Sequence, residues 1–112
     1  MESDTQYMTP DMKRRYTALE KDRNDIMLKI AKGLSDLRNA HADINAMKAY
    51  GRISKVAFER NPALAESHEL SLEYLTAELE RKGQAVTELY RQYDEIEERK
   101  LDIVLESLDA RR

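Results

Sequence analysis

Apolar side chains recur at alternating spacings of four and three residues along both halves of the chain, and this spacing leaves little choice of fold. On an α-helix, residues spaced in this way lie on one side, whereas a β-strand would need a period of two. An apolar stripe that repeats every 3.5 residues is the surface through which helices pack in a coiled coil. The sequence therefore predicts two long helical arms that pack through their stripes.

The first stripe defines an arm that we expect over residues 10–49. Thr9 suits the N-cap of a helix, and Pro10 suits its first position, where the missing N–H costs nothing. The preceding residues 1–8 are polar and lack a pattern, so we expect a disordered tail there. The twelve positions of the stripe, nine of them apolar, are Met12, Tyr16, Leu19, Arg23, Ile26, Ile30, Gly33, Leu37, Ala40, Ile44, Met47 and Gly51.

The second stripe defines an arm that we expect over residues 62–110, with Asn61 as its cap and Pro62 as its first residue. The twelve positions of this stripe, again nine of them apolar, are Ala65, His68, Leu72, Leu75, Leu79, Lys82, Val86, Leu89, Tyr93, Ile96, Lys100 and Ile103. A helix of 3.6 residues per turn drifts from a strict heptad, so the apolar face rotates near the end of the arm. The residues of the rotated face are Leu101, Val104, Leu105 and Leu108.

Between the arms, residues 50–61 are expected to reverse the chain. The heptad register stops near Gly51, and Asn61 is disfavoured in a helix because it precedes a proline. A tight helical turn, a bent linker and a short β-hairpin each fit this segment. The predicted fold is all-α, an antiparallel two-helix coiled-coil hairpin with a short non-helical or β-hairpin reversal around residues 50–61.

Charge and size favour a protein partner. Residues 1–56 carry 11 Lys and Arg against 8 Asp and Glu, and residues 57–112 carry 8 against 14, so the halves have opposite net charge. The overall net charge of −3 argues against a nucleic-acid partner. A two-helix hairpin has little core and leaves apolar residues outside the stripes, so we expect an oligomer or a subunit of a complex. Those residues are Met27, Leu28, Leu34, Leu70, Tyr74, Tyr90, Leu101 and Leu105.

Several classes of protein are excluded by what the sequence lacks. The chain has no cysteine, which excludes a disulfide framework, and its longest apolar runs are three residues, too short for a membrane span of about 20 or a signal peptide. A cytoplasmic location is therefore expected. No nucleotide-binding loop, nucleophile elbow or zinc-protease motif occurs, so we expect no enzymatic activity and no cofactor.

The two histidines and the acidic runs have plain interpretations. His41 and His68 fit the surface or the edge of a stripe, so no metal site is predicted. The alternative is a two-histidine metal site with Asp43 or Glu69 as a third ligand. The acidic runs around residues 78–80 and 94–98 fit the solvated flank of a coiled coil better than a set of catalytic carboxylates.

The ends of the two arms allow two interpretations. The apolar residues there either hold the arms together or splay apart and bind a client protein, for which adaptable methionine side chains are suited. The candidate contact residues are Met8, Met12, Tyr16, Leu101, Val104, Leu105 and Leu108.

Three stretches of the chain resemble β-type prefoldin subunits, in particular subunit 6. The segment Ser71-Leu72-Glu73-Tyr74-Leu75-Thr76-Ala77-Glu78-Leu79-Glu80-Arg81 is similar to part of their second arm, and Arg15-Tyr16-Thr17-Ala18-Leu19-Glu20-Lys21-Asp22 is similar to the start of their first. Residues 50–60 lie where that family has its hairpin. A looser likeness links residues 47–51 and 90–99 to helical intraflagellar-transport subunits.

The prefoldin resemblance implies a subunit of a hexameric, ATP-independent holdase chaperone. Its arm tips would hold unfolded proteins, and its middle would join a β-barrel platform with other subunits. The assembly contacts implied by the resemblance are Tyr50, Ile53, Val56 and Phe58. The alternative function is a structural coiled-coil adaptor in a transport or cytoskeletal assembly.

Overall fold

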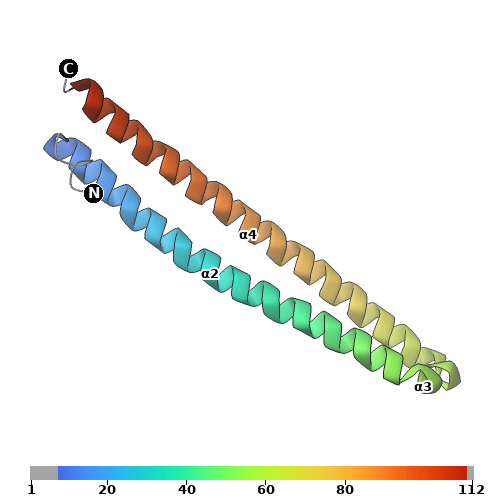
Figure 1. Cartoon of the computed structure of the whole chain (residues 1–112). Coiled ribbons are helices and arrows are strands. Elements are labelled where there is room, and N and C mark those ends of the chain that lie inside the picture. The colour runs from blue at the N-terminus through green and yellow to red at the C-terminus, as the bar shows by residue number, and fades with distance from the viewer. Residues whose placement is uncertain (1–7, 111–112) are drawn as a thin grey trace. The chain divides into compact units, whose positions relative to one another are not determined.

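The chain is helical along nearly its whole described length. The computed structural model describes residues 8–110, and each of these is helical except Met8, Thr9, Ser54 and Asn61. Three helices follow one another along the chain: α2 (Pro10–Ile53), α3 (Lys55–Arg60) and α4 (Pro62–Ala110) (Figure 1). No strand occurs within residues 8–110, so the all-α prediction is confirmed.

Helix α2 begins where its capping residues predict. The hydroxyl oxygen of Thr9 accepts a hydrogen bond of 3.1 Å from the backbone N–H of Met12, and this bond satisfies one of the unpaired donors of the first turn. Of the tail expected over residues 1–8, residues 1–7 lie outside the described part of the chain. Met8 is described, and its side chain is only 6% exposed.

The segment between the long helices differs from the expected form. Helix α2 continues to Ile53, and the helical hydrogen bonds run on through Ser54, whose N–H donates to the Tyr50 carbonyl at 2.9 Å and whose carbonyl accepts from Phe58 at 2.9 Å. Asn61 has φ −135° and ψ 89°, outside the helical region, because it precedes a proline. A non-helical or β-hairpin form of residues 50–61 is therefore wrong. Apart from Ser54 and Asn61, the segment is helical.

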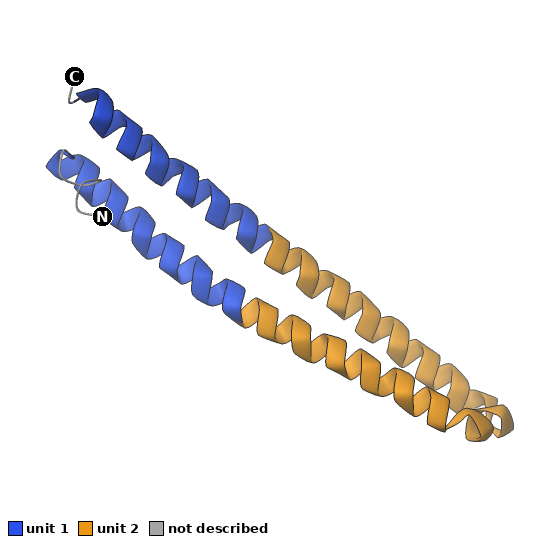
Figure 2. Cartoon of the chain, viewed as in Figure 1, with its two compact units in different colours: residues 1–31, 88–112 blue, residues 32–87 orange. Residues whose placement is uncertain are grey.

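The chain divides into two compact units, residues 1–31 with 88–112 and residues 32–87, coloured separately in Figure 2. In the first, the beginning of α2 packs against the end of α4. Met8 and Met12 form a buried cluster with Ile103, and Ile26 forms another with Ile96. Higher numbers on α2 thus meet lower numbers on α4, so the two segments run in opposite directions within this unit.

The second unit, residues 32–87, holds the end of α2, all of α3 and the beginning of α4. Leu37 lies opposite Gly83, where a Cβ would be 3.9 Å from the leucine Cδ2 atom. The His68 ring reaches the Met47 carbonyl oxygen at 2.8 Å. These contacts again pair higher positions on α2 with lower positions on α4.

Burial follows the stripes predicted from the sequence. All twelve stripe positions on α2 are buried or half-buried, and Ala49 is the one other residue of that helix that is not exposed. All twelve stripe positions on α4 are also buried or half-buried. Within residues 8–110, none of the helices is both long enough and apolar enough to cross a membrane.

Candidate protein-binding surfaces

An exposed apolar surface lies where α2 passes into α3. It consists of Tyr50, Ile53 and Val56, and we call it the turn surface. The Ile53 side chain is 85% exposed, the largest exposure among the large apolar side chains of the described residues. Three of the four predicted assembly residues thus lie on the surface, and the fourth, Phe58, is half-buried.

The Tyr50 ring of the turn surface packs with two further rings, those of Phe58 and His68. The ring centroids of Phe58 and His68 are 5.1 Å apart, and that of Tyr50 lies 6.0 Å from each. The Nε2 atom of His68 lies 2.8 Å from the Met47 carbonyl oxygen, so Nε2 carries a hydrogen and donates it. This bond ties the beginning of α4 to the end of α2 and fixes the ring on which Phe58 packs.

Gly51 makes this arrangement possible. A Cβ at this position would lie 2.6 Å from His68 Cε1 and 2.9 Å from His68 Nε2, closer than van der Waals contact allows. The sequence showed Gly51 only as an exception in the first stripe. A glycine inside a helix costs roughly 0.5–1 kcal/mol against alanine, and it often marks a close approach, which was the available signal for this contact.

The segment that carries the turn surface has a positive net charge. Residues 48–60 contain four basic residues and one acidic residue. Along the chain, the exposed apolar side chains are therefore flanked mainly by cations. Such a surface complements an apolar protein surface with an acidic rim.

The predicted contact residues at the ends of the arms fall into two groups. Met8 and Met12 are buried, and Tyr16 and Val104 are half-buried against the cluster around Ile103, so these four hold the two segments together. The remaining three are exposed on α4, and they are Leu101, Leu105 and Leu108.

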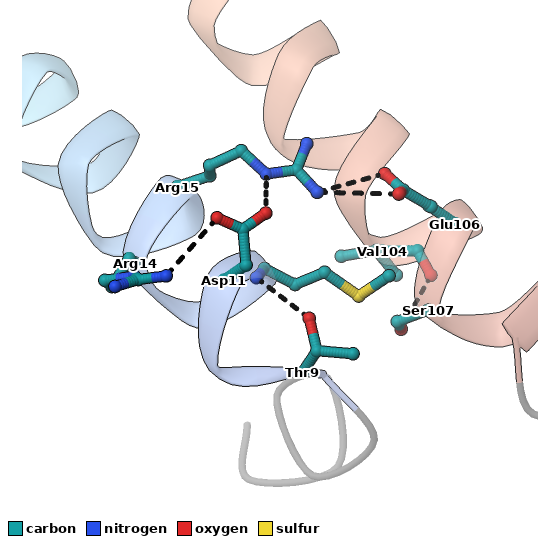
Figure 3. Close-up of polar contacts among 8 residues, drawn as sticks. Thr9, Asp11, Arg14, Arg15, Val104, Glu106 and Ser107 are labelled. Atoms are coloured by element: carbon teal, nitrogen blue, oxygen red, sulfur yellow. Dashed lines mark hydrogen bonds and ion pairs between the residues drawn. The ribbon is translucent and has the colours of Figure 1, made fainter.

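Polar side chains also connect the beginning of α2 with the end of α4 (Figure 3). The Arg15 guanidinium lies between the Asp11 carboxylate at 3.2 Å on its own helix and the Glu106 carboxylate at 3.4 Å on α4. Ser107 is buried, and its hydroxyl donates to the Val104 carbonyl at 2.9 Å. The serine therefore occupies a position between the helices without leaving its polar atom unpaired.

The charged stripe residues of this unit also have partners. Arg23 Nη2 donates to the Tyr93 hydroxyl at 3.3 Å, and its guanidinium lies over the Tyr93 ring, 5.5 Å from the centroid. Its Nε atom is 2.8 Å from a carboxylate oxygen of Glu97, a close ion pair whose geometry is too poor for a hydrogen bond. The Tyr93 bond, and then the negative charge of Glu97, raise the pKa of Arg23. Such a polar group in a stripe favours one register of the two helices.

Most pairs among the exposed charges lie within one helix. Arg91 bonds Glu88 at 2.7 Å and Glu95 at 3.1 Å, and the Glu88 bond lowers the pKa of that carboxyl. Arg81 likewise lowers the pKa of Glu78. Paired at the solvated surface with arginines of the same helix, these carboxylates stabilise α4.

The histidines lie in separate environments. His41 is exposed and contacts the Asn45 side chain at 3.3 Å, while His68 bonds the Met47 carbonyl. Among residues 8–110, no three His, Cys, Asp or Glu side chains are grouped so that they could hold a metal ion.

Comparison with protein-family models, curated proteins and solved structures finds no match to this chain.

Proposed function

We propose that this chain is a non-enzymatic helical subunit of a protein assembly, folded as one antiparallel two-helix coiled-coil hairpin whose turn surface docks another protein. The observation that carries the proposal is the exposure of Tyr50, Ile53 and Val56, on a segment whose Tyr50 and Phe58 rings pack with that of His68. Exposed apolar patches that are rimmed by polar residues mark protein–protein contact sites.

The partner that fits the turn surface is a protein with an apolar patch and an acidic rim. The four basic residues among positions 48–60 would face that rim. Rim charges set the association rate and the choice of partner, while the apolar centre supplies the affinity. The chain is then an adaptor, in line with the second function expected from the sequence.

The adaptor proposal is tested by photo-crosslinking in native lysate. A crosslinking residue at Ile53 should yield one discrete adduct, and the same residue at exposed Lys55, two positions away, should yield much less. In the chain without a crosslinking residue, Ile53→Ser should abolish capture of that partner. The helical circular dichroism should stay unchanged, because the Ile53 side chain is 85% exposed. Equal adducts at both positions, or capture unaffected by Ile53→Ser, would refute it.

A prefoldin-like holdase is the second candidate. The exposed Leu101, Leu105 and Leu108 support it, since a holdase needs apolar surface for unfolded chains. The helical form of residues 50–61 favours the adaptor, because a prefoldin platform is built from paired strands. The two are separated by adding the chain at stoichiometric amounts to a denatured, aggregating client. Suppressed light scattering indicates the holdase, and unchanged scattering indicates the adaptor.

A further inference from the structure

The outward side of α4 near its end is apolar. Leu101 and Leu105 each lie two positions from the buried Ile103, which is about 200° around a helix, so they point away from the other helix of their unit. Leu108 follows Leu105 by three positions and lies on the same side. The three leucines are 56%, 50% and 41% exposed, and we call them the leucine face.

The acidic side chains next to the leucine face lack cationic partners. Residues 88–110 contain eight acidic and three basic residues, and the three basic side chains are already paired with glutamates. Asp94, Glu98 and Asp102 are exposed on the outward side, and none of them forms an ion pair with another of residues 8–110. The described part of the chain therefore leaves negative charge beside the leucines without a counter-charge.

The turn surface has the opposite charge. Its segment contains four exposed basic residues, which are Lys48, Arg52, Lys55 and Arg60. Within residues 8–110 none of the four forms an ion pair. Arg52 and Lys55 directly adjoin Ile53 and Val56 in the chain, so cations lie beside the exposed apolar side chains. One chain thus carries two exposed apolar surfaces of complementary charge.

We propose that the turn surface of one copy of this chain docks on the leucine face of a second copy. This inference rests on the proposed docking role of the turn surface and names its partner, because the leucine face is an apolar patch with an acidic rim. In the contact, the apolar side chains of the turn surface pack on the leucines, and Arg52 and Lys55 lie close to Glu98 and Asp102. A docked pair keeps one surface of each kind free, so further copies can add or the assembly can close on itself.

Charge also disfavours contact between like surfaces. Two leucine faces would bring carboxylates together, and two turn surfaces would bring cations together, and such like-charge contacts oppose association. Three apolar side chains on each surface make a small interface, so the dissociation constant should lie between about 1 µM and 1 mM. High salt should weaken the contact further, because the charges are exposed.

Light scattering on the purified chain measures the association. The mass should rise above 13.1 kDa as the concentration increases through this range, and it should fall back at high salt. Ile53→Ser and Leu105→Ser should each stay monomeric. Leu28→Ser on α2 and Leu70→Ser on α4 are the matched controls, because these side chains are 72% and 58% exposed, and both should associate like wild type. A wild-type chain that is still monomeric at about 1 mM, or controls that lose association equally, would overturn the proposal.

Mixing the two monomeric variants distinguishes contact between unlike surfaces from contact between like ones. Ile53→Ser keeps its leucine face and Leu105→Ser keeps its turn surface, so a one-to-one mixture should form a complex of twice 13.1 kDa. Both substituted side chains are exposed, so circular dichroism should match that of wild type. Association of either variant alone, or a mixture that stays monomeric, would refute the pairing.

A photo-crosslinking residue at Ile53 separates this inference from the adaptor function. In the purified chain it should link to a second copy, within residues 94–108. If the purified chain gives no such adduct and native lysate gives a discrete adduct with a different protein, the second copy is refuted as the partner and the docking role of the turn surface stands. The absence of a discrete adduct in both would refute both proposals.

Discussion

Replacing Gly51 with alanine puts a methyl carbon 2.6 Å from Cε1 and 2.9 Å from Nε2 of His68. The histidine ring must move, and it then loses its 2.8 Å bond to the Met47 carbonyl and its contact with the Phe58 ring. Gly83 offers a matched comparison, because a Cβ there would lie 3.9 Å from Leu37, an ordinary contact distance.

The two substitutions should change the free energy of unfolding by clearly different amounts. Alanine in place of glycine inside a helix stabilises by roughly 0.5–1 kcal/mol. Gly83→Ala should show this gain in the free energy of unfolding. Gly51→Ala should not show this gain, because the moved ring gives up two contacts. The hydrogen bond of His68 contributes about 0.5–1.5 kcal/mol to the free energy of unfolding, and its contact with Phe58 contributes a similar amount. The two variants should therefore differ by about 1–3 kcal/mol.

The assay is urea unfolding followed by circular dichroism at one protein concentration. A double-mutant cycle with His68→Ala isolates the cause, since Gly51→Ala should become stabilising by roughly 0.5–1 kcal/mol once the ring is gone. Equal stabilisation by Gly51→Ala and Gly83→Ala in the wild-type chain would refute the reasoning. So would a Gly51→Ala loss that persists without His68.

Three further predictions concern the stripes and the surface charges. Arg23→Ala should lower the urea midpoint more than Arg38→Ala, because Arg23 donates a hydrogen bond to Tyr93 and forms an ion pair with Glu97 on α4, whereas Arg38 is an exposed residue outside the stripe; equal midpoints would contradict this. Ile103→Ala should cost about 2–5 kcal/mol in the free energy of unfolding, whereas Leu28→Ala should change it by less than about 0.5 kcal/mol; the exposed fractions are 4% and 72%. The pKa of Glu88 is lowered by its arginine partner, so the stabilisation it gives is present above its ordinary value of 4.5 and is lost as pH falls through the folded-state pKa. Thermal melts should therefore show a smaller loss of Tm between pH 7 and pH 3 for Glu88→Gln than for wild type.

The helices and their buried sides could be predicted from the sequence because they depend on local spacing. All 24 predicted stripe positions, twelve on each long helix, are buried or half-buried. The starts at Pro10 and Pro62 followed from the fixed backbone angle of proline and the caps before it. These features need only the period of the helix and the chemistry of neighbouring residues.

The secondary structure of residues 50–61 could not be predicted from the sequence. The segment has no heptad pattern, and a tight helical turn, a bent linker and a short β-hairpin all fit it. The structure keeps the segment helical through Ser54 and leaves the helix at Asn61. The conformation of this segment depends on contacts between distant residues: His68 lies against Gly51 in space but is 17 positions away in the chain.

The ends of the arms show the same division. The spacing placed Met12 in the first stripe, but it placed Leu105 both outside the stripes and on the rotated face of the second arm, so it left the burial of Leu105 open; in the structure Met12 is buried and Leu105 is exposed. Local periodicity determines which residues share a side of a helix. Only the tertiary structure determined that the leucines beside the stripe at the end of α4 are left exposed, because burial depends on contacts between residues far apart in the chain.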